Sequence, residues 1–208
     1  MSADTSSLAA ALPDGMVITD PDILAGYRQD RAFDPAAGTP LALVRPTSTD
    51  EVQATVRWCA ENRVPIITRG AGTSLSGGST AVDGAIMLST EKMREIAVDP
   101  PATRTAVVQP GLFNSEVKAA AAAEGLWYPP DPSSFEICSI GGNVATNAGG
   151  LCCVKYGGVT TDYVLGLQVV LADGRAVRVG GRQLKDSAGL PLTKLFVGSE
   201  GSSASSPR

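Results

Sequence analysis

The feature that most constrains the fold is a series of local patterns that ends in a glycine-rich loop. Residues 41–45 form an apolar run between two prolines, which predicts a short buried strand. A helix capped by Ser48 or Thr49 is expected next, and residues 64–68 predict a second buried strand. The apolar positions on one face of this helix are Val52, Val56, Cys59 and Ala60. The chain should therefore form a strand, a helix, a strand and then the glycine-rich residues 69–78.

The rest of the chain predicts an α+β fold with a small N-terminal lobe and a second lobe that begins near Val164. The expected elements are strands at 85–88 and 105–109, an alanine-rich helix at 115–124, and a hairpin at 164–171 and 176–179. The dipeptide Asp173-Gly174 between the last two strands is typical of a hairpin turn. Residues 128–158 contain so many Pro, Gly, Asn and Ser residues that we expect a long functional loop there.

Composition narrows the possible functions. The formal charge is −4 and no basic residues cluster, so nucleic-acid binding is not expected. No apolar run approaches the roughly 18–20 residues of a membrane span. The first dozen or so residues, expected to be a flexible polar leader, lack the basic region of a signal peptide. These features predict a cytoplasmic protein without a transmembrane segment.

The side chains available for catalysis are also restricted. The chain contains no histidine, which excludes an imidazole base, a His-ligated metal and a flavin attached through His. No metal site is expected. The cysteines have no disulfide-framework spacing and are expected to be small apolar fillers: Cys59, Cys138, Cys152 and Cys153.

Residues 69–78, called here the first glycine loop, can bind an anion. Glycines allow consecutive backbone N–H groups to converge on a phosphate, and Thr73 and Ser74 add hydroxyl donors. The loop is not a P-loop, because no Gly-Lys-Ser/Thr follows. It is not the Rossmann fingerprint either, because Leu75 stands where the third glycine belongs. Taken alone, the loop is equally compatible with an ordinary glycine-rich turn.

Residues 139–150, called here the second glycine segment, contain a second concentration of glycine and asparagine. They follow the proline-rich residues 128–134. Two segments that each present backbone donors fit an extended dinucleotide better than a single phosphate. The alternative is a purely structural cluster of turns.

Together these motifs resemble the FAD-binding domain of the vanillyl-alcohol oxidase and p-cresol methylhydroxylase superfamily. Within it, the chain is similar to the branch of the glycolate oxidase D-subunit, D-lactate dehydrogenase and D-2-hydroxyglutarate dehydrogenase. The matching pieces, in family order, are Val44-Arg45-Pro46, the first glycine loop, Pro130-Asp131-Pro132, the second glycine segment, Lys155-Tyr156-Gly157 and Phe196-Val197-Gly198-Ser199-Glu200-Gly201.

The resemblance implies a two-lobed α+β domain of the p-cresol methylhydroxylase type whose second lobe is incomplete. Residues 1–38 would be a leader and N-terminal helix region, 39–201 the FAD-binding domain with lobes at about 39–160 and 161–201, and 202–208 an aberrant tail.

The resemblance also implies three groups of residues around the cofactor. The FAD pyrophosphate would be held by Gly70, Ala71, Gly72, Thr73, Ser74 and Gly77. The ribityl and isoalloxazine region would be lined by Pro130, Asp131, Ser139, Gly141, Gly142, Asn143, Thr146, Asn147 and Gly149. Glu200 and Gly201 would lie near the adenosine end. Many covalent members have a His where this chain has Thr73-Ser74, so FAD is expected to be noncovalent.

The end of the sequence departs from the family, whose members continue with a further strand, a cap domain and histidines. Deleting one base from a GC-rich coding sequence for the usual continuation yields Ser-Ser-Ala-Ser-Ser-Pro-Arg and a stop, which is the ending observed here. We therefore expect a truncated chain.

The family reaction is oxidation of a 2-hydroxy acid of the D-lactate, glycolate or D-2-hydroxyglutarate type to the 2-oxo acid, with electrons passing through FAD to an acceptor. No residue is assigned as the catalytic base, since Asp131 suits a turn between prolines. Two alternatives are a flavin-dependent reductase of cell-wall precursor synthesis and a non-catalytic flavin-binding fragment.

Overall fold

The computed structural model describes residues 4–99, 103–156, 158–185 and 187–201. The predicted aberrant tail, 202–208, lies outside the described residues, as does Gly157. The described residues contain both helices and strands, and the strands form three separate sheets, which confirms the α+β class. Among the described residues, no helix is both long and apolar enough to cross a bilayer.

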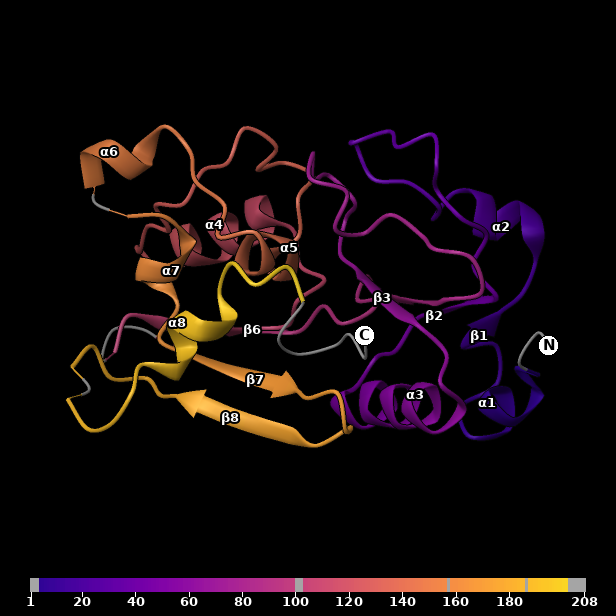
Figure 1. Cartoon of the computed structure of the whole chain (residues 1–208). Coiled ribbons are helices and arrows are strands. Elements are labelled where there is room, and N and C mark those ends of the chain that lie inside the picture. The colour runs from indigo at the N-terminus through magenta and orange to yellow at the C-terminus, as the bar shows by residue number, and fades with distance from the viewer. Residues whose placement is uncertain (1–3, 100–102, 157, 186, 202–208) are drawn as a thin grey trace.

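The N-terminal part is built on a four-stranded sheet (Figure 1). Its strands are β1 (Val17–Ile18), β2 (Ala42–Val44), β3 (Ile66–Arg69) and β4 (Ile86–Ser89). They lie in the order β1-β2-β4-β3, and β4 runs parallel to both β2 and β3 while β1 is antiparallel to β2. The predicted strand, helix and strand are thus confirmed as β2, α3 (Thr49–Asn62) and β3.

Alternation along the strands gives this sheet two apolar faces, because successive side chains point to opposite sides. Val44, Ile86 and Leu88 pack on one face with helix α3. Leu43 and Met87 pack on the other face, where helix α2 (Pro21–Ala25) contributes a leucine. The sheet is therefore covered on both sides.

Helix α3 begins and ends where its local sequence specifies. The Ser48 hydroxyl accepts a hydrogen bond from the Glu51 N–H, and the Glu51 carboxylate accepts one from the Ser48 N–H at 3.0 Å. This reciprocal capping box satisfies donors that the first turn leaves free. The helix ends at Asn62, and the left-handed backbone of the next residue, Arg63 (φ 55°), lets the Val64 N–H donate to the Cys59 carbonyl at 2.9 Å.

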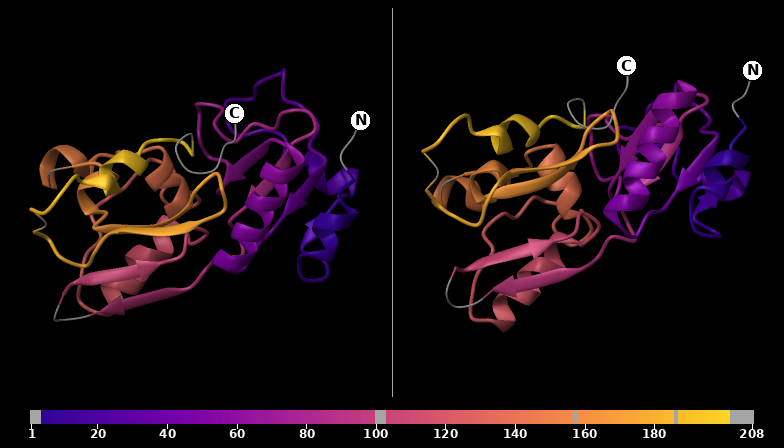
Figure 2. Two further views of the ribbon diagram at one scale, coloured as in Figure 1. Left: turned by 60° about the horizontal axis from the view of Figure 1, so that its bottom comes forward. Right: turned by 90° about the horizontal axis from the view of Figure 1, so that it is seen from below.

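The later part of the chain contains two antiparallel hairpins and short helices (Figure 2). The strands are β5 (Ile96–Asp99), β6 (Thr105–Val108), β7 (Gly166–Val170) and β8 (Ala176–Gly180). The helices are α4 (Asn114–Ala123), α5 (Ile140–Ala145), α6 (Cys152–Tyr156), α7 (Thr160–Tyr163) and α8 (Leu192–Phe196). Leu112, Val117 and Ile140 form a small core between β5, β6, α4 and α5.

The predicted Asp173-Gly174 hairpin is confirmed, and its turn docks on α3. Gly174 has φ 79°, and its carbonyl accepts hydrogen bonds from Gln53 Nε2 at 2.7 Å and Arg57 Nη2 at 3.1 Å. Contacts between residues more than 110 positions apart in sequence thus join the hairpin to helix α3, which packs on the first sheet. The lobe division at about 160 stays a prediction.

Two predictions about order were wrong. The expected flexible leader contains helix α1 (Ser6–Ala10), in which Leu8 is fully buried against α3 and the sheet. A hydrogen bond from Trp58 Nε1 to Ser7 Oγ at 2.9 Å reinforces that packing. Residues 128–158, expected to be one long loop, contain α5 and α6. Strand β5 was not predicted.

The buried contact of Leu8 leads to a stability prediction. Leu8→Ala should lower the free energy of unfolding by about 2–4 kcal/mol, because it removes apolar contacts and leaves a cavity. Leu184→Ala, at a position that is 87% exposed, should change it by less than about 0.5 kcal/mol. Urea denaturation followed by circular dichroism measures both. Equal effects of the two substitutions would show that α1 is not part of the core.

Candidate functional site

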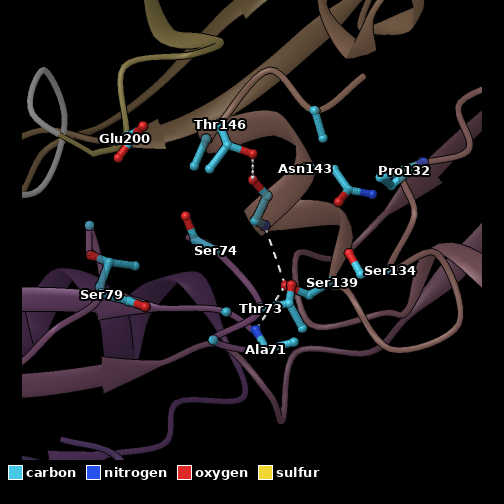
Figure 3. A pocket seen from close by; sticks show the side chains of 17 residues that line it. Ala71, Thr73, Ser74, Ser79, Pro132, Ser134, Ser139, Asn143, Thr146 and Glu200 are labelled. Atoms are coloured by element: carbon cyan, nitrogen blue, oxygen red, sulfur yellow. Dashed lines mark hydrogen bonds between the residues drawn. The ribbon is translucent and has the colours of Figure 1, made fainter. Parts of the chain in front are cut away.

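The two glycine-rich segments meet around a pocket of about 140 Å³ (Figure 3). Ser74 and Ser79 lie on one side of it and Thr146 on the other. The pocket is lined by Thr68, Gly70, Ala71, Gly72, Thr73, Ser74, Gly78, Ser79, Pro132, Ser134, Ser139, Gly142, Asn143, Ala145, Thr146, Ala148 and Glu200. Segments about 70 residues apart in sequence therefore form one site.

The first glycine loop lines this pocket and contains free backbone donors. Strand β3 ends at Arg69, and Gly72 and Gly77 then adopt left-handed backbone with φ of 67° and 79°. The N–H groups of Gly72, Thr73 and Ser74 donate to no acceptor among the described residues. Consecutive N–H groups of this kind form a binding site for an anion.

Ser139 holds the two segments together. Its hydroxyl oxygen accepts hydrogen bonds from the Ala71 N–H at 3.1 Å and from the Gly142 N–H at 3.3 Å. The second bond caps helix α5. A Cβ atom at Gly70 would collide with the Ser139 hydroxyl, so the close approach of the segments requires glycine at position 70.

Helix α5 places a polar side chain against the pocket. Asn143 is 2% exposed, and its Nδ2 has no hydrogen-bond partner within the described part of the chain. A buried donor without a partner is costly, so a ligand acceptor here would be stabilised. The Thr146 hydroxyl donates to the Gly142 carbonyl at 2.9 Å and lies at the other end of the helix.

Glu200 completes the pocket from the far end of the sequence. It has a left-handed backbone with φ 50°, and its N–H donates to the Ala145 carbonyl at 2.8 Å. Its Oε2 accepts a hydrogen bond from the Ser76 hydroxyl at 3.0 Å. Glu200 is the one charged residue that lines the pocket within the described ranges, so an anion there would be held by dipoles and not by a lining cation.

The pocket includes ten of the predicted cofactor residues. These are Gly70, Ala71, Gly72, Thr73, Ser74, Ser139, Gly142, Asn143, Thr146 and Glu200. The other seven do not line it: Gly77, Pro130, Asp131, Gly141, Asn147, Gly149 and Gly201.

Several of those seven support the surrounding chain. Asp131 Oδ1 accepts a hydrogen bond from the Cys152 N–H at 2.9 Å, and this bond lowers the pKa of the Asp131 carboxyl. Asn147 has φ 49°, and its Oδ1 accepts a hydrogen bond from the Thr161 N–H at 2.9 Å. Gly141 packs so closely on Pro110 that a Cβ atom would lie 2.6 Å from the proline ring.

Seven lining residues were not predicted: Thr68, Gly78, Ser79, Pro132, Ser134, Ala145 and Ala148. Gly78 belongs to the first glycine loop, and Pro132 and Ser134 belong to the proline-rich run before the second glycine segment. Because these three residues lie within recognised motifs, the sequence could have indicated them as pocket residues. Ser79 was not indicated by any motif.

The cysteines differ from one another. Cys59 and Cys138 are buried as expected, and burial raises the pKa of the Cys59 thiol to about 12. Cys152 and Cys153 are only partly buried, so the prediction of apolar filling was wrong for this pair. Cys153 Sγ accepts a hydrogen bond from the Gly150 N–H at 3.0 Å. No group of His, Cys, Asp or Glu side chains in the described ranges could hold a metal ion.

Sequence comparison identifies related proteins. Residues 40–180 match the model of a family described as an FAD binding domain. The chain is 49% identical over 162 residues to the glycolate oxidase subunit GlcD of Bacillus subtilis, which covers 78% of this chain and 34% of that protein. It is 43% identical over 170 residues to a D-lactate dehydrogenase of Archaeoglobus fulgidus, which covers 82% of this chain and 38% of that protein. The chain thus spans about a third of the length of these relatives.

Structure comparison supports the predicted fold type. The structure of p-cresol methylhydroxylase with substrate bound matches with a TM-score of 0.77 at 24% identity, and the match covers 93% of this chain and 39% of that chain. At this identity the likeness concerns the fold alone, and it confirms the p-cresol methylhydroxylase type of domain.

The bonds of Ser139 lead to a second stability prediction. Ser139→Ala should lower the free energy of unfolding by about 1–2 kcal/mol, because the N–H groups of Ala71 and Gly142 lose their acceptor. Hydrogen exchange at those two amides should accelerate more than elsewhere. Ser134→Ala is the matched control, since Ser134 lines the same pocket and its hydroxyl forms no hydrogen bond within the described ranges. Similar exchange rates in the two variants would contradict the role of Ser139.

Proposed function

The chain belongs to the FAD binding domain family, and from this we propose that it is the FAD-binding portion of a flavin-linked oxidoreductase that converts a 2-hydroxy acid into a 2-oxo acid. The observation that carries the proposal is the pocket between the two glycine-rich segments, in which three consecutive N–H groups lack an acceptor.

The residues present fit FAD. The free N–H groups of Gly72, Thr73 and Ser74 suit the negatively charged diphosphate. The unpaired Asn143 Nδ2 suits an acceptor on the same ligand, because binding would satisfy a buried donor. The absence of a side chain at Gly70 and Gly72 lets the loop pack closely on Ser139 and Arg69 beside the pocket.

The proposed contacts follow the family motifs. Gly70, Ala71, Gly72, Thr73, Ser74 and Gly77 would hold the diphosphate. The ribityl chain and ring system would lie along Pro130, Asp131, Ser139, Gly141, Gly142, Asn143, Thr146, Asn147 and Gly149. Glu200 and Gly201 would lie near the adenosine, where a carboxylate can accept hydrogen bonds from ribose hydroxyls. Because the chain contains no histidine, we propose noncovalent binding.

The proposed reaction concerns the whole protein. The relatives named above are a glycolate oxidase subunit and a D-lactate dehydrogenase, and this chain spans about a third of their length. The redox chemistry of such a reaction comes from the flavin. The residues of this chain bind and orient it, and none is assigned as a base. A separate electron acceptor and a cytoplasmic location are part of the proposal.

FAD binding is tested by a matched pair of glycine substitutions. Gly72→Val should abolish FAD retention, because valine disfavours a φ of 67° and its Cβ would collide with the Arg69 guanidinium. Gly15→Val carries a similar backbone penalty at φ 75°, but nothing lies within 4 Å of its Cβ. It should bind FAD like the unsubstituted chain. Quenching of flavin fluorescence measures the FAD affinity of both variants. Equal affinities would show that the first glycine loop is not part of the FAD site.

The reaction is tested in a chimera. The 170-residue segment matched in the Archaeoglobus fulgidus D-lactate dehydrogenase is replaced by the corresponding residues of this chain. The chimera should bind FAD and reduce an artificial dye with D-lactate, and Gly72→Val in the chimera should abolish both. The parent enzyme, assayed in parallel, is the control. If the parent oxidises D-lactate and the chimera binds FAD but does not, the proposed reaction is contradicted.

A further inference from the structure

The guanidinium of Arg69 lies directly against the first glycine loop. Arg69 is the last residue of β3, and a Cβ atom built at Gly72 would collide with its Nη2 and would lie 3.0 Å from its Nη1. The loop residue with a free N–H therefore packs on a cation. Arg69 does not line the pocket itself, so its charge would act from behind the loop.

This cation is buried and forms a direct ion pair with no carboxylate of the described residues. Arg69 is 9% exposed, its Nη1 donates to the Gln29 carbonyl at 2.9 Å, and its Cζ lies 5.7 Å from the centre of the Tyr27 ring. In the part of the chain that the structure describes, it forms no ion pair. Burial lowers the pKa of Arg69, although an arginine remains charged. Buried charges are normally paired. The carboxylates of Asp30 and Glu91 act on Arg69 without a direct ion pair to it, so an anion at closer range would stabilise its charge further.

The carboxylates near Arg69 form their direct ion pairs and hydrogen bonds with other groups. A second cavity, of about 390 Å³, is bordered by Arg69, Glu91 and Arg94. Glu91 accepts from Arg45 at 3.3 Å and from the Tyr27 hydroxyl at 2.9 Å, while Arg94 pairs with Glu116. The carboxylate of Asp30, which also acts on Arg69, accepts hydrogen bonds from the Ser79 N–H and the Thr80 hydroxyl.

We propose that Arg69 is the buried counter-charge of the diphosphate held by the first glycine loop. This inference rests on the proposed binding of FAD. Arg69 is a positioning residue that acts through Gly72, since it supports the loop and supplies positive potential where the lining residues include no cation. Its own burial without an ion pair then has a reason, because the ligand supplies the missing negative charge.

The test separates charge from shape at position 69. Two neutral variants, Arg69→Gln and Arg69→Met, should weaken FAD binding by at least about tenfold, as expected for loss of a charge interaction at short range. Arg69→Lys keeps the charge and should weaken it by less than about threefold. Arg178→Met removes the same charge from an exposed position on β8 and should bind FAD like the unsubstituted chain. Fluorescence titration gives the affinities, and circular dichroism verifies folding of each variant.

Riboflavin, which lacks the diphosphate, serves as a second ligand. The neutral variants should bind it no more weakly than the unsubstituted chain does. Equal losses in Arg69→Lys and Arg69→Gln, or equal losses for FAD and riboflavin, would show that Arg69 acts by packing and would overturn the proposal. FAD affinity of the neutral variants equal to that of Arg178→Met would overturn it as well. Absence of FAD binding by the unsubstituted chain is a different result, which would reject the proposed function itself.

Discussion

The hydroxyl of Ser139 is the interaction on which the geometry of the site depends. It accepts one hydrogen bond from the first glycine loop and one from helix α5, across 68 positions of sequence. Without it, the first glycine loop, which carries the free N–H of Gly72, would lose its direct hydrogen bond to the segment that carries Asn143. With it, the loop and the segment face one small volume. The restriction at Gly70 has the same origin, because only a residue without a side chain lets the two backbones come this close.

The parts of the fold that were predictable from sequence are those with a local cause. The helix that became α3 has a capping box at its start and an apolar face, and the Asp173-Gly174 turn specifies its hairpin within a few residues. Helix α5 has no such signal, because Gly141 and Gly142 both disfavour a helix. Gly141 is required there by the close packing on Pro110, a contact between distant residues. Helix α1 likewise depends on burial of Leu8 against elements that come later in the sequence.

The candidate site was only partly indicated by local composition. Dense runs of glycine, serine and asparagine indicated backbone donors, while the family resemblance supplied the individual cofactor residues, ten of which line one pocket. The sequence could not indicate which residues of a run face the pocket and which hold its walls. Asp131 and Asn147 have polar side chains that could contact a cofactor, but these side chains accept hydrogen bonds from the backbone of neighbouring segments. Arg69 was not predicted as a site residue, because the sequence does not show that its charge is buried beside the first glycine loop.

The strand order of the first sheet has a consequence for how the chain acquires its structure. Strand β4 lies between β2 and β3 although it follows both in sequence, so β2 and β3 do not pair with each other. During synthesis, the sheet cannot form completely until Ser89, the last residue of β4, has left the ribosome. Before then, helix α3 can pack only on an incomplete sheet. Pairing of this kind is non-local and therefore slow. The first glycine loop, which joins β3 to β4, is consequently the connection whose closure completes the sheet.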